Sequence, residues 1–218
     1  MKKFAVVLFL LFFLTISLNA QEKYGLDLKI GSAIPMLNFS DIYDANISAE
    51  IGLLMPFSEN LQFTLNAGYY KWNLNNAKFN SVNQNTQVDY YDIEAPIDAF
   101  PLTIGLRYKL LDAKAIPYLI GEFGFYYYKQ KLSGSYIQND QTYPAPEMEN
   151  SGFSTIFGFG FGFAYPFSES VRFDAAAKFN GALKSQKVDV PDNNNGLNSA
   201  SNVSYFLTAM AGINIYFD

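Results

Sequence analysis

The chain has 218 residues and a net charge of −5, from 15 Lys and Arg residues against 20 Asp and Glu residues. This acidic balance argues against a nucleic-acid-binding protein, because such domains carry clusters of basic side chains. The absence of both Cys and His excludes disulfides, thiol nucleophiles and the commonest general base and transition-metal ligand.

The first 20 residues have the pattern of a secretory signal peptide. Lys2 and Lys3 precede an apolar run, Phe4–Leu14, and a more polar stretch then ends in the small residue Ala20. A membrane anchor needs about 20 apolar residues, and this run is shorter. We therefore expect residues 1–20 to be removed and residues 21–218 to form one domain of an exported protein.

The rest of the chain alternates apolar and polar residues with a period of two along eight segments. Such alternation is typical of strands rather than helices. Each segment approaches the roughly 9–11 residues that a tilted strand needs to cross a bilayer. The segments are Tyr24–Ile34, Ala45–Met55, Leu61–Tyr69, Phe100–Leu110, Tyr118–Tyr127, Phe157–Ala164, Val171–Phe179 and Val203–Phe217.

The connections between these segments alternate in length. Three are short: Pro56–Asn60, Leu111–Ile116 and Pro166–Ser170. The others are longer: Pro35–Asp44, Asn73–Asp98, Lys129–Gly152 and Gly181–Asn202. Outer-membrane barrels have short periplasmic turns and long external loops. The sequence therefore predicts an all-β fold, an eight-stranded antiparallel up-and-down transmembrane β-barrel, closed between its first and last strands.

Residue size decides which face of each strand points inward. A soluble lipocalin-like barrel would place the apolar face inside, but the alternating phenylalanines of Phe157–Phe163 are too bulky for an eight-stranded interior. Facing lipid instead, they leave the alternating glycines of Gly158–Gly162 in the lumen. Lys71 and Lys129 fall in the outward phase at the loop-side ends, where they can reach headgroups. The charges of the central segments then point inward as a lumen charge network: Asp27, Lys29, Glu50, Arg107, Lys109, Glu122, Arg172, Asp174 and Lys178.

These nine charges are nearly balanced, so we expect them to pair, because an unpaired charge in a confined interior is costly. A turn centred near Ala113–Lys114 places Arg107 opposite Ile120 or Glu122, and we predict an Arg107–Glu122 pair. A hairpin centred on Ser168 would likewise place Lys178 near Gly158 and Asp174 near Gly162.

Aromatic residues cluster where the predicted strands end. Residues 69–72 include Tyr69, Tyr70 and Trp72, and residues 126–128 are all tyrosines. A second group lies near the turns: Tyr108, Tyr118, Tyr165, Phe167 and Phe217. We interpret them as part of the interfacial girdle of a membrane barrel. An alternative is a sugar-binding aromatic patch at the loop-side rim.

Two segments resemble a known family. Phe100–Leu110 (FPLTIGLRYKL) followed by Pro117–Tyr128 (PYLIGEFGFYYY) is similar to the small outer-membrane β-barrels of the PorT type, within the wider group of OmpA- and OmpX-like eight-stranded barrels of gram-negative bacteria. The final residues Ile215–Phe217 resemble the terminal aromatic signal that the barrel-assembly machinery reads, although Asp218 follows them. The resemblance implies the outer membrane as location, and it carries no catalytic residue.

The residues favour a protein that is not an enzyme and that binds no cofactor or metal. Asp89, Asp92, Glu94 and Asp98 could be proposed as a carboxylate or Ca²⁺ site, but we interpret them as a solvated acidic loop. The many asparagines of residues 73–85 favour solvated loop tips over a preformed pocket.

The function that we expect is structural anchoring or loop-mediated binding by an integral outer-membrane barrel whose lumen is filled with side chains. An accessory subunit of a secretion or assembly machine and a small solute pore are the alternatives. The expected partners are outer-membrane lipid and lipopolysaccharide, the barrel-assembly machinery during biogenesis, and a protein bound through the long loops, but no nucleic acid.

Overall fold

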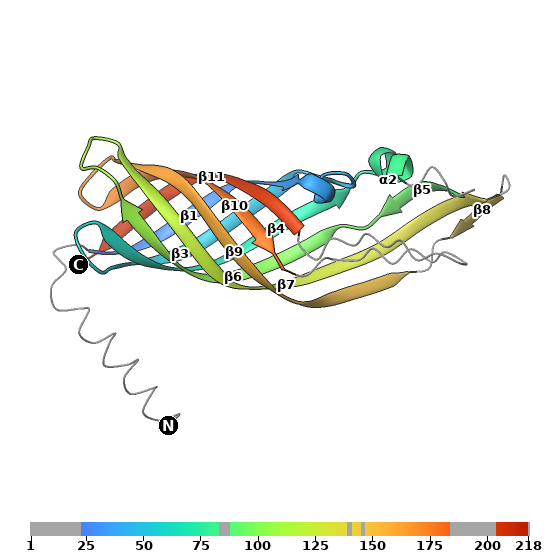
Figure 1. Cartoon of the computed structure of the whole chain (residues 1–218), viewed down its shortest axis with the longest axis horizontal. Coiled ribbons are helices and arrows are strands. Elements are labelled where there is room, and N and C mark those ends of the chain that lie inside the picture. Colours follow the sequence, from blue (N-terminus) through green and yellow to red (C-terminus); the bar gives the residue numbers. More distant parts are fainter. Residues whose placement is uncertain (1–22, 83–87, 139–140, 145–146, 184–203, 218) are drawn as a thin grey trace, which may run out of the picture.

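The computed structural model describes residues 23–82, 88–138, 141–144, 147–183 and 204–217 (Figure 1). The predicted signal peptide lies outside these residues. Eight long antiparallel strands close into a barrel, which confirms the predicted fold class. They are β1 (Tyr24–Met36), β3 (Asn46–Pro56), β4 (Leu61–Leu74), β6 (Ile97–Lys109), β7 (Ile116–Gln138), β9 (Met148–Pro166), β10 (Val171–Ala182) and β11 (Ser204–Phe217).

The barrel closes between β1 and β11, as the sequence predicts. Their ladder runs without interruption from Tyr24 opposite Phe217 to Met36 opposite Tyr205. Closure leaves no strand edge unpaired within the wall, which a bilayer requires because lipid cannot satisfy backbone polar groups. No helix among the described residues is long and apolar enough to cross a membrane.

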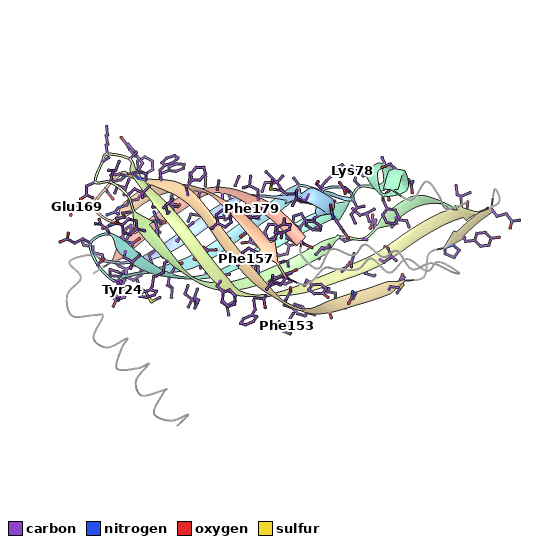
Figure 2. The ribbon with its side chains drawn as sticks, in the orientation of Figure 1. Tyr24, Lys78, Phe153, Phe157, Glu169 and Phe179 are labelled. Atoms are coloured by element: carbon purple, nitrogen blue, oxygen red, sulfur yellow. The ribbon has the colours of Figure 1, made fainter. Side chains whose placement is uncertain are left out.

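The outer wall is apolar and the inner wall is polar. Ile104 and Phe161 are more than 60% exposed, whereas Asp174 and Thr208 on the inner phase are fully buried. Figure 2 shows the side chains standing out from the wall along the barrel, with Phe153 among them. This distribution confirms that the phenylalanine phase faces outward, as a barrel in lipid requires.

The loop side is more ordered than the sequence predicts. Here the 3₁₀ turn η1 (Leu37–Phe39), β2 (Tyr43–Asp44), α2 (Asn76–Val82), β5 (Val88–Glu94) and β8 (Gln141–Pro144) lie between the barrel strands. The predicted long loop Lys129–Gly152 is largely strand, because β7 and β9 stay paired as far as Leu132 opposite Met148.

Beyond that point β5 and β8 flank β7, and this sheet projects past one end of the barrel (Figure 1). We call the projecting part of β5, β7, β8 and β9 the extension. Lys78 of α2 lies toward the extension, whereas Glu169 lies in a short turn at the opposite end of the barrel (Figure 2).

Candidate functional site

Asp174 is the centre of a charged cluster in the turn-side half of the lumen. One carboxylate oxygen accepts hydrogen bonds from Arg107 Nη2 at 2.7 Å and Asn214 Nδ2 at 3.0 Å. The other accepts from the Tyr118 hydroxyl at 2.7 Å and lies 3.0 Å from Lys29 Nζ. These donors come from β6, β11, β7 and β1, so the cluster spans the whole lumen.

Two further contacts complete this turn-side cluster. Lys29 Nζ also donates to Asp27 at 2.5 Å, so two bases face two acids and the cluster is neutral. The Arg107 guanidinium stacks on the Tyr118 ring, 3.6 Å from its centroid. Tyr118 fits there because Gly162 has no side chain: a Cβ at Gly162 would lie 2.4 Å from the ring.

Lys178 is the centre of a second cluster nearer the loop side. Its Nζ lies 2.8 Å from both carboxylate oxygens of Glu50 and 2.9 Å from Glu122. Tyr70 donates its hydroxyl hydrogen to Glu50, and Asn66 Nδ2 donates to Glu122 at 2.9 Å. One lysine therefore faces two carboxylates, and a neutral donor adds one hydrogen bond to each of them.

The predicted Arg107–Glu122 pair is wrong. The predicted turn is present, since Arg107 lies opposite Ile120 and Glu122 lies opposite Gly105. Arg107 nevertheless reaches across the lumen to Asp174 on β10. Glu122 binds Lys178, which also lies on β10. In so narrow a barrel, long side chains reach strands that are not neighbours in the wall, and adjacent-strand register does not reveal those contacts.

The predicted register of the β9–β10 hairpin is also wrong, by two residues. Lys178 lies opposite Gly160, and Asp174 lies opposite Ala164. The turn is centred on Glu169 rather than Ser168, because the backbone N–H groups of residues 167 and 168 both donate to the carbonyl of Val171. The inward phase is unchanged, so the charges still face the lumen.

The structure brings seven of the nine predicted lumen charges into these two clusters and leaves two nearer the turns. Lys109 Nζ lies 3.3 Å from the backbone oxygen of Glu59, and the Arg172 guanidinium stacks 4.5 Å from the centroid of the Tyr216 ring. The sequence reasoning missed the neutral partners Asn66 and Asn214, although their inward phase could have revealed them. It also predicted Tyr118 as a girdle residue, which is wrong, because Tyr118 is fully buried in the lumen.

An apolar core fills the loop-side end of the barrel, above the Lys178 cluster. Tyr70, Trp72, Tyr126 and Tyr128 all point inward and are at least 93% buried. Their prediction as girdle residues is therefore wrong. Their sequence neighbours Tyr69 and Tyr127 lie in the outward phase instead and pack against Phe100 on the outer wall.

This apolar core includes residues of the barrel, of α2 and of the strands that lead into the extension. Its buried members are Ala33, Tyr43, Tyr70, Trp72, Phe79, Ile93, Ala95, Ile97, Ala99, Tyr126, Tyr128, Leu132, Ile156, Ala182 and Phe206. Together with the two charged clusters, it fills the lumen with side chains at three successive levels.

The four residues of the candidate acidic site lie in two different strands. Asp89 and Asp92 lie on β5, Glu94 ends that strand, and Asp98 lies on β6, where it accepts a 2.5 Å hydrogen bond from the Tyr69 hydroxyl. Within the described part of the chain, no group of three Asp or Glu residues is placed to hold a metal ion.

No protein-family model matches the sequence, and no curated protein matches it. A major outer membrane protein from Thermus thermophilus is 11% identical, with a TM-score of 0.52 over 89% of this chain and 99% of that chain. Ail, the attachment invasion locus protein of Yersinia pestis, is 12% identical, with a TM-score of 0.48 over 90% of this chain and 100% of that one. The outer membrane protease OmpT of Escherichia coli is 10% identical, with a TM-score of 0.48 over 93% and 100%.

The Thermus structure shows that this chain has the fold of outer-membrane β-barrels. The closed wall, the apolar outer surface and the buried polar lumen are what a membrane barrel requires. The wall and the fold together are those of a β-barrel that spans a membrane.

Proposed function

We propose that this protein is a non-enzymatic, non-conducting outer-membrane barrel that carries the extension as a binding surface. The observation that supports this proposal is the filled lumen. Two charged clusters and an apolar core occupy the lumen at three levels, and the interior of an eight-stranded barrel is just wide enough for side chains to fill it. A small solute pore is therefore disfavoured.

The extension is the part of the molecule that the barrel itself does not need. β7 has 23 residues, whereas a tilted strand crosses a bilayer in about 9–11, so about half of β7 lies outside the membrane. Exposed apolar side chains occur on the loop-side strands, including Tyr143, Met148 and Phe153. Such side chains suit contact with a protein partner. An accessory role in a secretion or assembly machine is one form that this binding could take.

Two measurements test the proposal. In planar bilayers we expect no conductance steps from the intact protein, and none from a Trp72→Ala variant, because the charged clusters remain below the apolar core. Regular single-channel steps from the intact protein would contradict the filled lumen.

For the binding role, residues 133–147 are replaced by a two-residue turn, which removes the tip of the extension and keeps the β7–β9 ladder of the wall. Cross-linked partners recovered from intact cells should disappear with the tip, while the truncated barrel keeps its heat-modifiable migration. Identical partners with and without the tip would exclude the extension as the binding surface.

A further inference from the structure

The Lys178 cluster contains more acids than bases. Lys178 Nζ lies 2.8 Å from a carboxyl oxygen of Glu50 and 2.9 Å from one of Glu122, so these two oxygens lie within about 6 Å of each other. At such a separation each negative charge disfavours the ionisation of the other group. Tyr70 and Asn66, which donate to the two carboxyl groups, are neutral. The cluster therefore combines two acids with a single base.

The bases of the turn-side cluster are already engaged. Lys29 lies opposite Glu50 in the β1–β3 ladder, but its Nζ is bound to Asp27 and Asp174. Arg107 is bound to Asp174 as well. Two bases thus face two acids there, and no positive charge is left over for the Lys178 cluster.

The other two bases of the lumen lie too far along their strands to serve this cluster. Arg172 precedes Lys178 by six residues on β10, or about 20 Å at roughly 3.3 Å per residue. Lys109 lies four residues beyond Gly105, which faces Glu122 in the β6–β7 ladder, or about 13 Å along β6. The strands on either side of Lys178 place uncharged residues opposite it: Gly160 on β9 and Thr208 on β11.

Water has little access to this cluster. The apolar core covers it on the loop side, and the turn-side cluster lies on its other side. The side chains of Lys178 and Glu122 are each 3% exposed, and that of Glu50 is 8% exposed. An unpaired carboxylate in such surroundings is so costly that the group becomes neutral instead.

We propose that the Lys178 cluster binds one proton, which the carboxyl groups of Glu50 and Glu122 share. One carboxyl group is then neutral and the other pairs with Lys178, so the cluster has no net charge. The proton belongs to the pair rather than to one residue, because coupled groups titrate together. This site does not depend on the function proposed above, since it involves neither a partner nor a solute.

Tyr70 connects this proton to the loop side of the molecule. Its hydroxyl donates to Glu50, and its ring packs edge-on against Phe206 in the apolar core, which also buries Ile93 and Leu132 at the base of the extension. When the proton leaves at alkaline pH, a second negative charge remains without a partner below the core, and water must pass the core to solvate it. The site therefore couples alkaline pH to opening of the core.

The direction of the pH dependence follows from proton linkage. The folded protein holds this proton at a pH at which ordinary glutamates of the unfolded chain have released theirs. The free energy of unfolding must then fall as the pH rises through the range in which the folded protein loses the proton.

Infrared spectroscopy of the full-length protein in micelles tests the proposal, because a protonated carboxyl group and a carboxylate absorb at different frequencies. We expect the band of a protonated carboxyl group in the parent at neutral pH and its loss at alkaline pH. Glu50→Gln and Glu122→Gln each leave one carboxylate with one lysine, so both variants should lack the band at neutral pH. Glu147→Gln is the matched control, since Glu147 is an exposed carboxylate outside the lumen, and this variant should keep the band.

Urea unfolding in the same micelles tests the coupling to stability. The midpoint of the parent and of Glu147→Gln should fall from neutral to alkaline pH. The midpoint of Glu122→Gln should fall much less, because its amide is neutral throughout. Heat-modifiable migration verifies that each variant folds, and the band of the parent with its loss at alkaline pH tests the proposal even where a variant does not fold.

Three results would overturn the inference. They are a parent without the band at neutral pH, a band that survives in both glutamine variants, and a midpoint in Glu122→Gln that falls as steeply as that of the parent. A parent that lacks the band and whose stability rises with sodium concentration would show that a metal cation, rather than a proton, neutralises the cluster. Conductance and cross-linking do not depend on the proton, so any of these results leaves the proposed function standing.

Discussion

The contact between Arg107 and Asp174 provides the most direct test of how the lumen is held together. Their atoms lie 2.7 Å apart, and the two side chains are 3% and 0% exposed. Removing one partner of a buried ion pair leaves an uncompensated charge and costs about 3–5 kcal/mol. We therefore expect Arg107→Met and Asp174→Asn each to lower the free energy of unfolding by about this amount.

The double variant separates pairing from general damage to the lumen. Because each single variant strands the other charge, the loss in the double variant should fall short of the sum of the two single losses by about 2 kcal/mol, within the range for contacting residues. Lys29 still faces Asp27 in the double variant, so the remaining cluster stays neutral.

The matched control is the pair that adjacent-strand register suggests but the structure does not contain. For Arg107→Met combined with Glu122→Gln, the losses should add within about 0.5 kcal/mol, as for groups without direct contact. For Lys178→Met combined with Glu122→Gln, they should not add, because Lys178 Nζ lies 2.9 Å from Glu122.

Equilibrium urea unfolding in micelles measures all three cycles, with Trp72, the only tryptophan of the chain, as the fluorescent probe. The reasoning fails if Arg107 and Asp174 prove additive. It also fails if Arg107 couples to Glu122 more strongly than to Asp174.

Three further predictions follow from single positions. Gly160→Ala should impair folding in micelles, because a Cβ there would lie 2.1 Å from a backbone oxygen of β10. Gly121→Ala should fold normally, since a Cβ at Gly121 meets no atom within 4 Å. Equal heat-modifiable migration of the two variants would contradict this prediction. The hydrogen bond from Lys78 holds the pKa of Asp44 below its ordinary value, so the stabilisation of α2 is present above the ordinary pKa of an aspartate and is lost as the pH falls through the lowered pKa. The protection factors of the α2 amides, which compare hydrogen exchange with its intrinsic rate at each pH, should therefore fall in acid, and this fall should be weaker in Asp44→Asn. Trp72 is 2% exposed inside the barrel, so brominated lipids should hardly quench its fluorescence. Strong quenching would show instead that Trp72 lies at the lipid interface.

The barrel wall could be predicted from the sequence because a period of two is a local property. The alternation in each segment predicts which residues share a face of the strand, and the row of phenylalanines in β9 predicts which face contacts lipid. Closure then follows from the number of strands and the alternation of turns and loops. The predicted turn between β6 and β7 is correct, since its centre near Ala113–Lys114 places Arg107 opposite Ile120 as observed.

The contacts within the lumen could not be predicted in the same way. They join residues of strands that are not neighbours in the wall, such as Arg107 of β6 and Asp174 of β10. The inward phase of these residues is visible in the sequence, but their partners depend on the tilt of the strands and the width of the barrel. The β9–β10 register is wrong for another reason: these strands are neighbours, but a shift of one residue in the centre of their turn moves each pair by two positions.

The prediction that these aromatic residues form an interfacial girdle failed for a different reason. Tyr69, Tyr70 and Trp72 occur together, and composition alone suggests one role for all three. The phase of β4 instead sends Tyr69 outward and the other two inward, where Tyr70 donates to Glu50 and Trp72 packs on Phe206. Applying the period of two to the aromatic residues, as to the charges, would have separated them.

The apolar core connects the filled lumen to the loop-side features proposed for binding. Ile93 and Leu132 belong to the strands of the extension and are buried in this core, so the element that closes the barrel also holds the base of the extension. Water excluded by the core cannot screen the Lys178 cluster below it, which strengthens the attraction between its charges. The filled lumen thus supports the part of the molecule outside the membrane, and our proposal places the residues that recognise a partner above the core rather than within the barrel.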